Sequence, residues 1–257
     1  MNFLSRSVVI ASAFALQCGC DNHPDRTLSP SPEAKWLNVT FRVPVGIALQ
    51  PAELLYRSKK CKSVRYNSSN EPHDIPGYND FEQPFNVSQG NNIQQLRVAV
   101  DGGGPCQWQL NSLRVSFRIA DDNSLTKGNE IIDTSYIFDF GDYGLSDGYG
   151  TGRAKAFREK LLELNPDLFP MVFINHMFKK TTLKLFGGET DYEKWSRRYR
   201  LSATENIYIN PFVHINKPVT LESPKTTAGN IRAFYPDGSS EEIPNISPDY
   251  EKLLSMK

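Results

Sequence analysis

The sequence has little of what marks membrane-spanning or nucleic-acid-binding proteins. The apolar run from Val8 to Leu16 has nine residues, about half of what a transmembrane helix needs. No later segment approaches a membrane-spanning length. The 29 Lys and Arg residues balance the 29 Asp and Glu residues, and a chain without a cationic excess is a poor match for nucleic acid. We therefore expect no membrane-spanning helix and no nucleic-acid partner.

Patterns that bind metals or phosphates are also missing. No two of the four histidines fall at the H-x-x-x-H spacing of a zinc site. Asp139, Asp142 and Asp147 supply carboxylates, but not at the spacing of a calcium loop. The glycine-rich segment around them lacks the Lys-Ser/Thr ending of a phosphate-binding loop. We expect no cofactor and no bound metal.

The N-terminus, MNFLSRSVVIASAFALQCGC, has the pattern of a secretory signal, because Arg6 precedes a short apolar run. Two cleavage sites compete. Ala13-Phe14-Ala15 fits an ordinary signal peptidase site. The residues before Cys20 resemble a bacterial lipobox, with Gly19 in place and Leu16 one position earlier than usual. The second interpretation, which we favour, predicts a signal peptide at 1–19 and a lipid on Cys20.

The residues after Cys20 suggest how the protein is held. Asp21 follows the cysteine directly, and this resembles the signal that keeps enterobacterial lipoproteins in the inner membrane. A diacylated and N-acylated cysteine carries enough acyl chain for stable anchoring. Residues 20–35 are rich in polar residues, Pro and Ser, which is typical of a flexible tether. We expect a periplasmic protein anchored to a membrane, the inner one rather than the outer.

The cysteine count agrees with this cleavage. Removal of residues 1–19 discards Cys18 and leaves Cys20 as the anchor. Cys61 and Cys106 then remain, and two cysteines in an oxidising compartment can form a disulfide. The alternative is two unpaired buried thiols.

Strand patterns dominate the rest of the chain. Polar and apolar residues alternate in Trp36–Val43, Ile93–Val100 and Trp108–Ile119. Ile131–Phe140 is rich in β-branched and aromatic residues. Asn67–Asn92 is rich in turn residues and is expected to be a long loop.

The strongest helix pattern is TGRAKAFREKLLEL, residues 151–164. Four of its apolar residues share one face at helical spacing: Ala154, Phe157, Leu161 and Leu164. We therefore predict an α+β fold, mostly antiparallel β and sandwich-like, with one central helix at 151–164. Residues 36–257 would form a β-rich periplasmic domain, either as one unit or as two subdomains split near residue 150.

The loop before this segment, GDYGLSDGYGTG, contains a G-x-S-x-G pattern around Ser146. Ser146 lies about six residues after the expected strand and about five before the expected helix, whereas a hydrolase nucleophile sits directly at the strand-to-helix turn. An acid and a histidine do follow in the hydrolase order, as Asp167 or Asp191 and His176 or His214. We expect no enzyme activity, and a serine hydrolase using Ser146 is the remote alternative.

The same loop has the residue types of an adaptable recognition loop. Tyr143 and Tyr149 offer contact area, and Asp142 and Asp147 offer charge. We predict these four residues as partner contacts. The alternative is an ordinary solvated loop.

Two basic clusters stand out. The first surrounds Cys61 without an acid and comprises Arg57, Lys59, Lys60, Lys62 and Arg65. The second flanks Trp195 and Tyr199 and comprises Lys194, Arg197, Arg198 and Arg200. Each cluster is either the solvated face of a strand or a contact with an acidic partner or anionic lipid headgroups.

One resemblance suggests a function. The lipobox-like start, the polar segment, Cys61 and the run GGGPCQWQL at Gly102–Leu110 resemble small enterobacterial lipoproteins encoded beside type VI secretion lipase effectors. The resemblance covers about residues 1–120. It implies a β-rich periplasmic immunity protein that binds and blocks a secreted toxin and has no chemistry of its own. The alternative is a structural or envelope-assembly lipoprotein without a toxin partner.

Overall fold

The computed structural model describes residues 24–87, 92–141, 154–188, 196–226 and 229–257. In these residues nearly all regular structure is strand, arranged in three sheets with one short α-helix. The sheets mix parallel and antiparallel pairs. The expected α+β class with a central helix is therefore wrong, because the chain is nearly all-β and its sheets are mixed.

Sheets A and B form a sandwich. Sheet A has eight strands in the order β11-β15-β10-β8-β3-β4, with β2 and β7 also paired to β8. Sheet B has five strands in the order β12-β16-β1-β6-β5. The strands of sheet A are β2 (Ile47–Leu49), β3 (Ala52–Tyr66), β4 (Pro72–Gln83), β7 (Asp101–Gly103), β8 (Trp108–Ile119), β10 (Thr134–Asp139), β11 (Lys155–Phe157) and β15 (Ser196–Leu201). The strands of sheet B are β1 (Trp36–Arg42), β5 (Asn86–Val87), β6 (Ile93–Ala99), β12 (Leu161–Leu164) and β16 (Asn206–Ile209).

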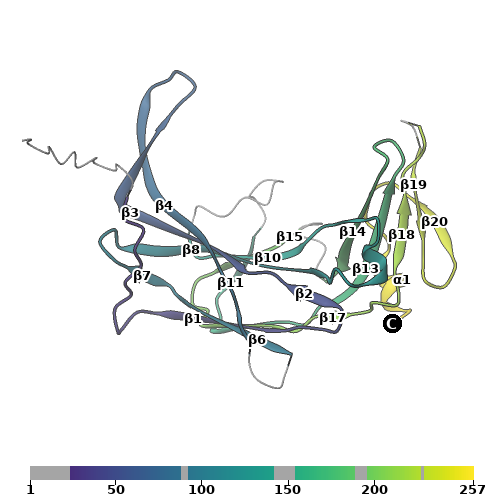
Figure 1. Cartoon of the computed structure of the whole chain (residues 1–257), viewed down its shortest axis with the longest axis horizontal. Helices are drawn as coiled ribbons and strands as arrows, with labels where there is room; N and C mark the ends of the chain where they lie inside the picture. The colour runs from purple at the N-terminus through teal and green to yellow at the C-terminus, as the bar shows by residue number, and fades with distance from the viewer. Residues whose placement is uncertain (1–23, 88–91, 142–153, 189–195, 227–228) are drawn as a thin grey trace, which may run out of the picture.

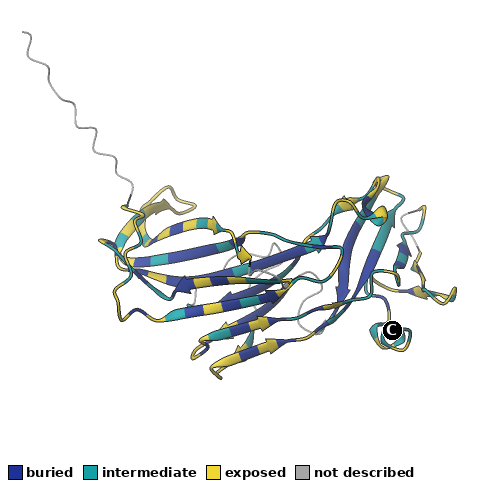
Figure 2. Cartoon of the chain, turned by 60° about the horizontal axis from the view of Figure 1, so that its bottom comes forward, coloured by how far each residue is buried: buried dark blue, intermediate teal, exposed yellow. Residues whose placement is uncertain are grey.

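The core between these sheets is rich in aromatic rings. Strand β8 has the bounds that the sequence predicts. Its apolar residues at every second position face the core, and Phe117 among them is fully buried. Its ring lies 5.0 Å from that of Phe41 in sheet B and 6.3 Å from that of Tyr136 in β10. Figure 2 shows the resulting alternation of buried and exposed residues along the strands. The Phe41–Phe117 pair therefore joins the two sheets, and the Phe117–Tyr136 pair packs neighbouring strands within sheet A.

Sheet C lies at one end of the sandwich (Figure 1). It has seven strands in the order β20-β19-β18-β13-β14-β9, with β17 paired to β13. They are β9 (Glu130–Ile131), β13 (Asp167–Asn175), β14 (Lys180–Gly187), β17 (Phe212–Val213), β18 (Val219–Glu222), β19 (Ile231–Phe234) and β20 (Ser240–Ile243). Leu183 and Leu185 of β14 join the sandwich core, whereas Phe169 and Phe186 join a second core. Helix α1 (Tyr250–Leu254) packs on this second core, and a short 3₁₀ helix, η1 (Ser124–Thr126), precedes β9.

Most of the described part of the segment predicted as a central helix, residues 154–164, is strand. Residues 155–157 form β11 and residues 161–164 form β12, while residues 151–153 lie outside the described part. Leu162 and Leu164 are buried and Leu161 and Glu163 are exposed, which is the period of a strand. Both strands pair in parallel with strands about 45 residues later in the chain. The segment forms strands instead of the predicted helix because these long-range pairings outweigh its local helical spacing. The local sequence does not encode such pairings.

The parallel partners cross from one sheet to the other together. Residues 155–164 and 196–209 lie side by side, each leaving sheet A and entering sheet B. Backbone hydrogen bonds hold the crossing, from Ser202 N–H to the Phe157 carbonyl (3.3 Å) and from Glu205 N–H to the Lys160 carbonyl (2.9 Å). Strands from both sides of residue 150 thus share sheets A and B.

The segment expected to be a long loop, Asn67–Asn92, contains the long strand β4. Strand β4 pairs antiparallel with β3 over most of its length, across a bulge between Ser58 and Lys62. The two strands form a hairpin that projects beyond the sandwich at the end away from sheet C (Figure 1). The turn residues that suggested a loop fall partly within this hairpin, at Pro76 and Gly77.

Candidate functional site

The loop residues predicted as partner contacts, Asp142, Tyr143, Asp147 and Tyr149, lie outside the described residues, as do Ser146 and Cys20. Their roles stay predictions. Asp139, just before this loop, ends strand β10 and is buried.

A large groove opens at the end of the sandwich, where the chain crosses from sheet A to sheet B. Its volume is about 1680 Å³. Its walls come from β3 and β4, from the start of β8, from residues 35–38 and from the crossing at 200–206. Segments that are far apart in the sequence therefore build one concave surface.

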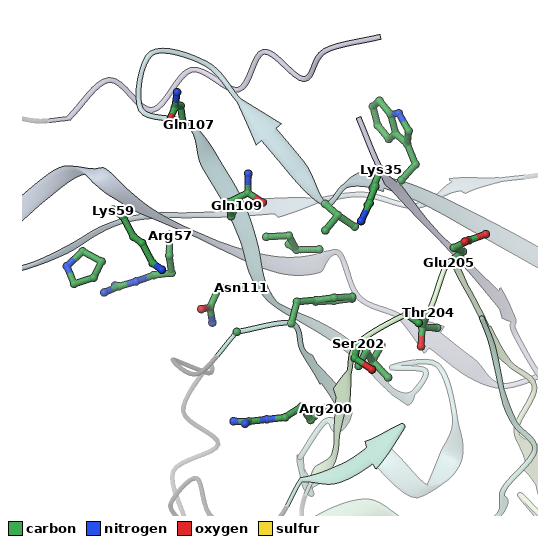
Figure 3. A pocket seen from close by; sticks show the side chains of 18 of the residues that line it. Lys35, Arg57, Lys59, Gln107, Gln109, Asn111, Arg200, Ser202, Thr204 and Glu205 are labelled. Carbon is green, nitrogen blue, oxygen red and sulfur yellow. The ribbon is translucent and has the colours of Figure 1, made fainter. Parts of the chain in front are cut away.

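The groove is strongly cationic. Its described lining includes seven cations, Lys35, Arg57, Lys59, Lys60, Arg65, Lys160 and Arg200. The lining holds one acid, Glu205, whose carboxylate lies 3.0 Å from Lys160 Nζ. In Figure 3, Arg57 and Lys59 lie on one side of Asn111, Lys35, Thr204 and Glu205 lie on the other, and Arg200 lies below it. The positive charge therefore surrounds the centre of the groove.

Four residues of the first basic cluster line this groove, and Lys62 does not. Lys59 and Lys60 lie in a bulge of β3. Ser58 is buried, its hydroxyl donates to the Cys106 carbonyl, and it accepts from the backbone N–H groups of Lys60 and Cys61. Cys61 and Cys106, the two cysteines expected to pair, are joined by a disulfide with their Cα atoms 5.3 Å apart. The bulge and the disulfide fix the backbone that carries Lys59 and Lys60.

The second basic cluster is divided by the structure. Arg200 is exposed and lines the groove. Arg198 is buried and its guanidinium group binds both carboxylate oxygens of Asp139. Arg197 is also buried, 5.7 Å above the ring of Tyr136. Lys194 and Trp195 lie outside the described residues. Only part of this cluster is therefore available to a partner.

Amide side chains cover much of the groove between the cations. Gln107, Gln109 and Asn111 line it from the start of β8. Asn38 and Asn206 also line it, and their side-chain amides are hydrogen-bonded at 3.1 Å. Amide N–H groups and cations both donate to carboxylate or phosphate oxygens. The lining suits an anionic partner and, among its described residues, includes no histidine or cysteine.

Sequence reasoning found part of this site. It identified the cations around Cys61 and Arg200, and it missed Lys35, Lys160 and the three amides of β8. Lys35 and Lys160 each lie close to an acid in the sequence, Glu33 and Glu159, and belong to neither of the two basic clusters. Nothing local shows that residues 35, 160 and 200 meet, because only the parallel crossing brings them together.

One acid–histidine pair from the sequence is brought together elsewhere. Asp167 Oδ1 lies 2.7 Å from His214 Nε2, and Asp167 Oδ2 lies 3.0 Å from Lys257 Nζ. Burial raises the pKa of the Asp167 carboxyl, but hydrogen bonds from His214 and Lys257 outweigh it and hold this pKa below its usual value. The Tyr250 hydroxyl donates to the Asp167 carbonyl (2.9 Å). This cluster ties helix α1 and the residues after it to sheet C.

No group of three or more His, Cys, Asp or Glu side chains among the described residues is placed to hold a metal ion. No helix in the described part is long and apolar enough to cross a membrane.

Comparison of the chain with protein-family models, with curated proteins and with solved structures found no match.

Proposed function

We propose that the protein is a lipid-anchored periplasmic binding protein, and that it acts as an immunity protein against a secreted antibacterial toxin of the type VI lipase class. The lipid is on Cys20, and Asp21 favours the inner membrane. The observation that carries the binding role is the groove, whose described lining has seven cations and one acid that is paired with Lys160. Such a surface fits an acidic segment of a protein partner.

Two further features support this proposal. The disulfide between Cys61 and Cys106 suits an oxidising compartment. The groove is built on strands and a disulfide-fixed bulge, so it is preorganised, and a partner pays little for ordering the site. Electrostatic complementarity of this kind raises association rates and selects the partner.

The test uses the effector encoded beside the gene. The purified protein is expected to bind it in solution and to protect cells that receive it. Lys59→Glu/Lys60→Glu reverses two exposed groove cations and is expected to weaken binding by roughly tenfold or more and to reduce its salt dependence. The measurement is binding by calorimetry at low and high salt.

The matched control is Lys127→Glu/Lys225→Glu, which reverses two exposed lysines that do not line the groove. This control is expected to bind like the unmodified protein. Equal losses in both variants would show that the groove is not the contact. An envelope defect on gene deletion without any toxin present would instead favour an envelope-assembly role.

A further inference from the structure

Residues 25–35 belong to the segment expected to be a tether, and they lie against the sandwich. The Asp25 carbonyl accepts a hydrogen bond from Trp108 Nε1 (3.0 Å), and the Arg26 carbonyl accepts one from Asn79 Nδ2 (2.8 Å). Trp108 is fully buried and Asn79 is 4% exposed, so both donors would lose their partners if the segment detached. Leu28 packs on the sandwich core.

The glycine run at 102–104 exists because this segment lies directly on it. A Cβ on Gly103 would lie 2.3 Å from the Ser29 carbonyl oxygen, and one on Gly104 would lie 2.2 Å from that of Thr27. Ser29 N–H also donates to the Gly102 carbonyl at 2.9 Å. Any side chain here would displace the segment, so the three glycines make the attachment possible.

This attachment shortens the link to the expected lipid. Asp25 is five residues after Cys20, and five fully extended residues span at most about 18 Å. A free tether over 20–35 would span at most about 50 Å. The sandwich end at Trp108 is therefore held close to the membrane that carries a Cys20 lipid.

The surface at this end is basic. Arg26, Lys59, Lys60 and Lys62 are exposed there, and no acid interrupts residues 57–65. The segment and the bulge are neighbours, because the Cβ position of Gly77 lies 3.5 Å from Trp108 and 2.3 Å from the Cys61 carbonyl oxygen. Acids also occur at this end: the Asp25 carboxylate accepts from Thr27 N–H, Asp74 lies 3.3 Å from Lys62, and exposed Asp80 follows Asn79 in β4.

We propose that the surface formed by Arg26, Lys59, Lys60 and Lys62, the anchor surface, rests on anionic lipid headgroups of the membrane that holds Cys20. This proposal depends on the proposed function in one respect only, the lipid on Cys20. Each Lys or Arg near an anionic membrane strengthens binding by about fivefold. Contact with headgroups would fix the orientation of the groove, because Lys59 and Lys60 of this surface also line the groove.

The test removes the lipid so that the surface acts alone. The chain from residue 20 with Cys20→Ser is mixed with vesicles of phosphatidylcholine, with or without phosphatidylglycerol, and floated on a gradient. The expected result is binding that requires phosphatidylglycerol and is lost in high salt. Arg26→Glu/Lys62→Glu is expected to lower this binding by at least about 25-fold, at roughly fivefold per charge.

Arg26 and Lys62 are used because neither lines the groove. The control is again Lys127→Glu/Lys225→Glu, expected to float like the unmodified chain. Equal binding to both kinds of vesicle, or an equal loss in the control, would overturn the proposal. Because binding of the effector in solution is measured separately, its failure and the failure of vesicle binding are distinguishable.

Discussion

The sandwich end around Trp108 and the end formed by sheet C hold their chain segments by different interactions. At the first, close backbone contacts on glycines, buried hydrogen-bond donors and the Cys61–Cys106 disulfide hold residues 25–35 and the β3 bulge. At the second, the partly exposed carboxylate of Asp167 holds His214 and Lys257. The cationic groove lies at the first end. The groove therefore lies at the end where the chain segments are held by contacts that depend least on pH and salt.

The two ends are nevertheless connected, because sheet C contributes residues to the sandwich core as well as to its own. Phe117→Ala in the sandwich and Phe169→Ala in sheet C each remove a fully buried ring, which is expected to cost about 3–5 kcal/mol of unfolding free energy. Because Leu183 and Leu185 of sheet C pack in the sandwich core, both changes should lower one cooperative transition. Denaturant unfolding followed by circular dichroism checks this. Two separate transitions would show that the ends fold independently.

Loss of the disulfide should increase local opening most at the sandwich end. Cys61→Ser/Cys106→Ser opens a link across 45 residues, and the chain-entropy model gives a loss of about 4 kcal/mol. Hydrogen exchange is expected to rise most in β3, β4 and the start of β8. A rise of equal size in sheet C would contradict the difference between the two ends.

The glycine run can be tested against a glycine of similar conformation. Gly104 has φ +72° and no room for a Cβ, whereas Gly128 has φ +76° and nothing within 4 Å. Both Gly→Ala changes bear the strain of positive φ, about 1 kcal/mol. Gly104→Ala is expected to be destabilised further and to expose residues 25–35 to proteolysis. Equal stability of the two variants would mean that the segment yields without cost.

The smallest effect is expected at Asp167. Because the pKa of its carboxyl is held below the usual value in the folded protein, its stabilising contribution is present above about pH 4 and lost as the pH falls through the lowered pKa. Asp167→Asn should therefore reduce stability at neutral pH, by about 0.2–1 kcal/mol, and converge with the unmodified protein in acid. Thermal unfolding against pH checks this, with exposed Asp122→Asn as the control. A constant difference at every pH would contradict this explanation.

Much of the strand content could be predicted because it follows from the local alternation of polar and apolar residues. In β8, Leu113, Val115 and Phe117 face the core at every second position, and the strand has the predicted bounds. The prediction of a helix at 151–164 is wrong because the sequence LLEL fits the period of a helix and that of a strand. The parallel pairing of β12 with β16 selects the strand. Strand β4 was missed because Pro76 and Gly77 are turn residues by type, yet here Gly77 leaves room for the Cys61 carbonyl.

For the candidate site, the sequence contained the charges but not their arrangement. The cations around Cys61 are consecutive enough to be seen as a cluster. Arg198 and Arg200 look alike in the sequence, yet Arg198 is buried against Asp139 and Arg200 lines the groove. They differ because the Arg198 side chain meets the Asp139 carboxylate of the neighbouring strand β10, whereas the Arg200 side chain reaches the groove.

By itself, the sequence determined the strand-rich character of the chain, the balance of charge and the candidate pair of cysteines, because these follow from composition and from alternation over a few residues. The tertiary structure decided that residues 25–35 lie on three glycines and that two distant crossing segments enclose a cationic groove. Contacts between residues far apart in the chain are selected by the packing of the whole molecule, and no local pattern records them.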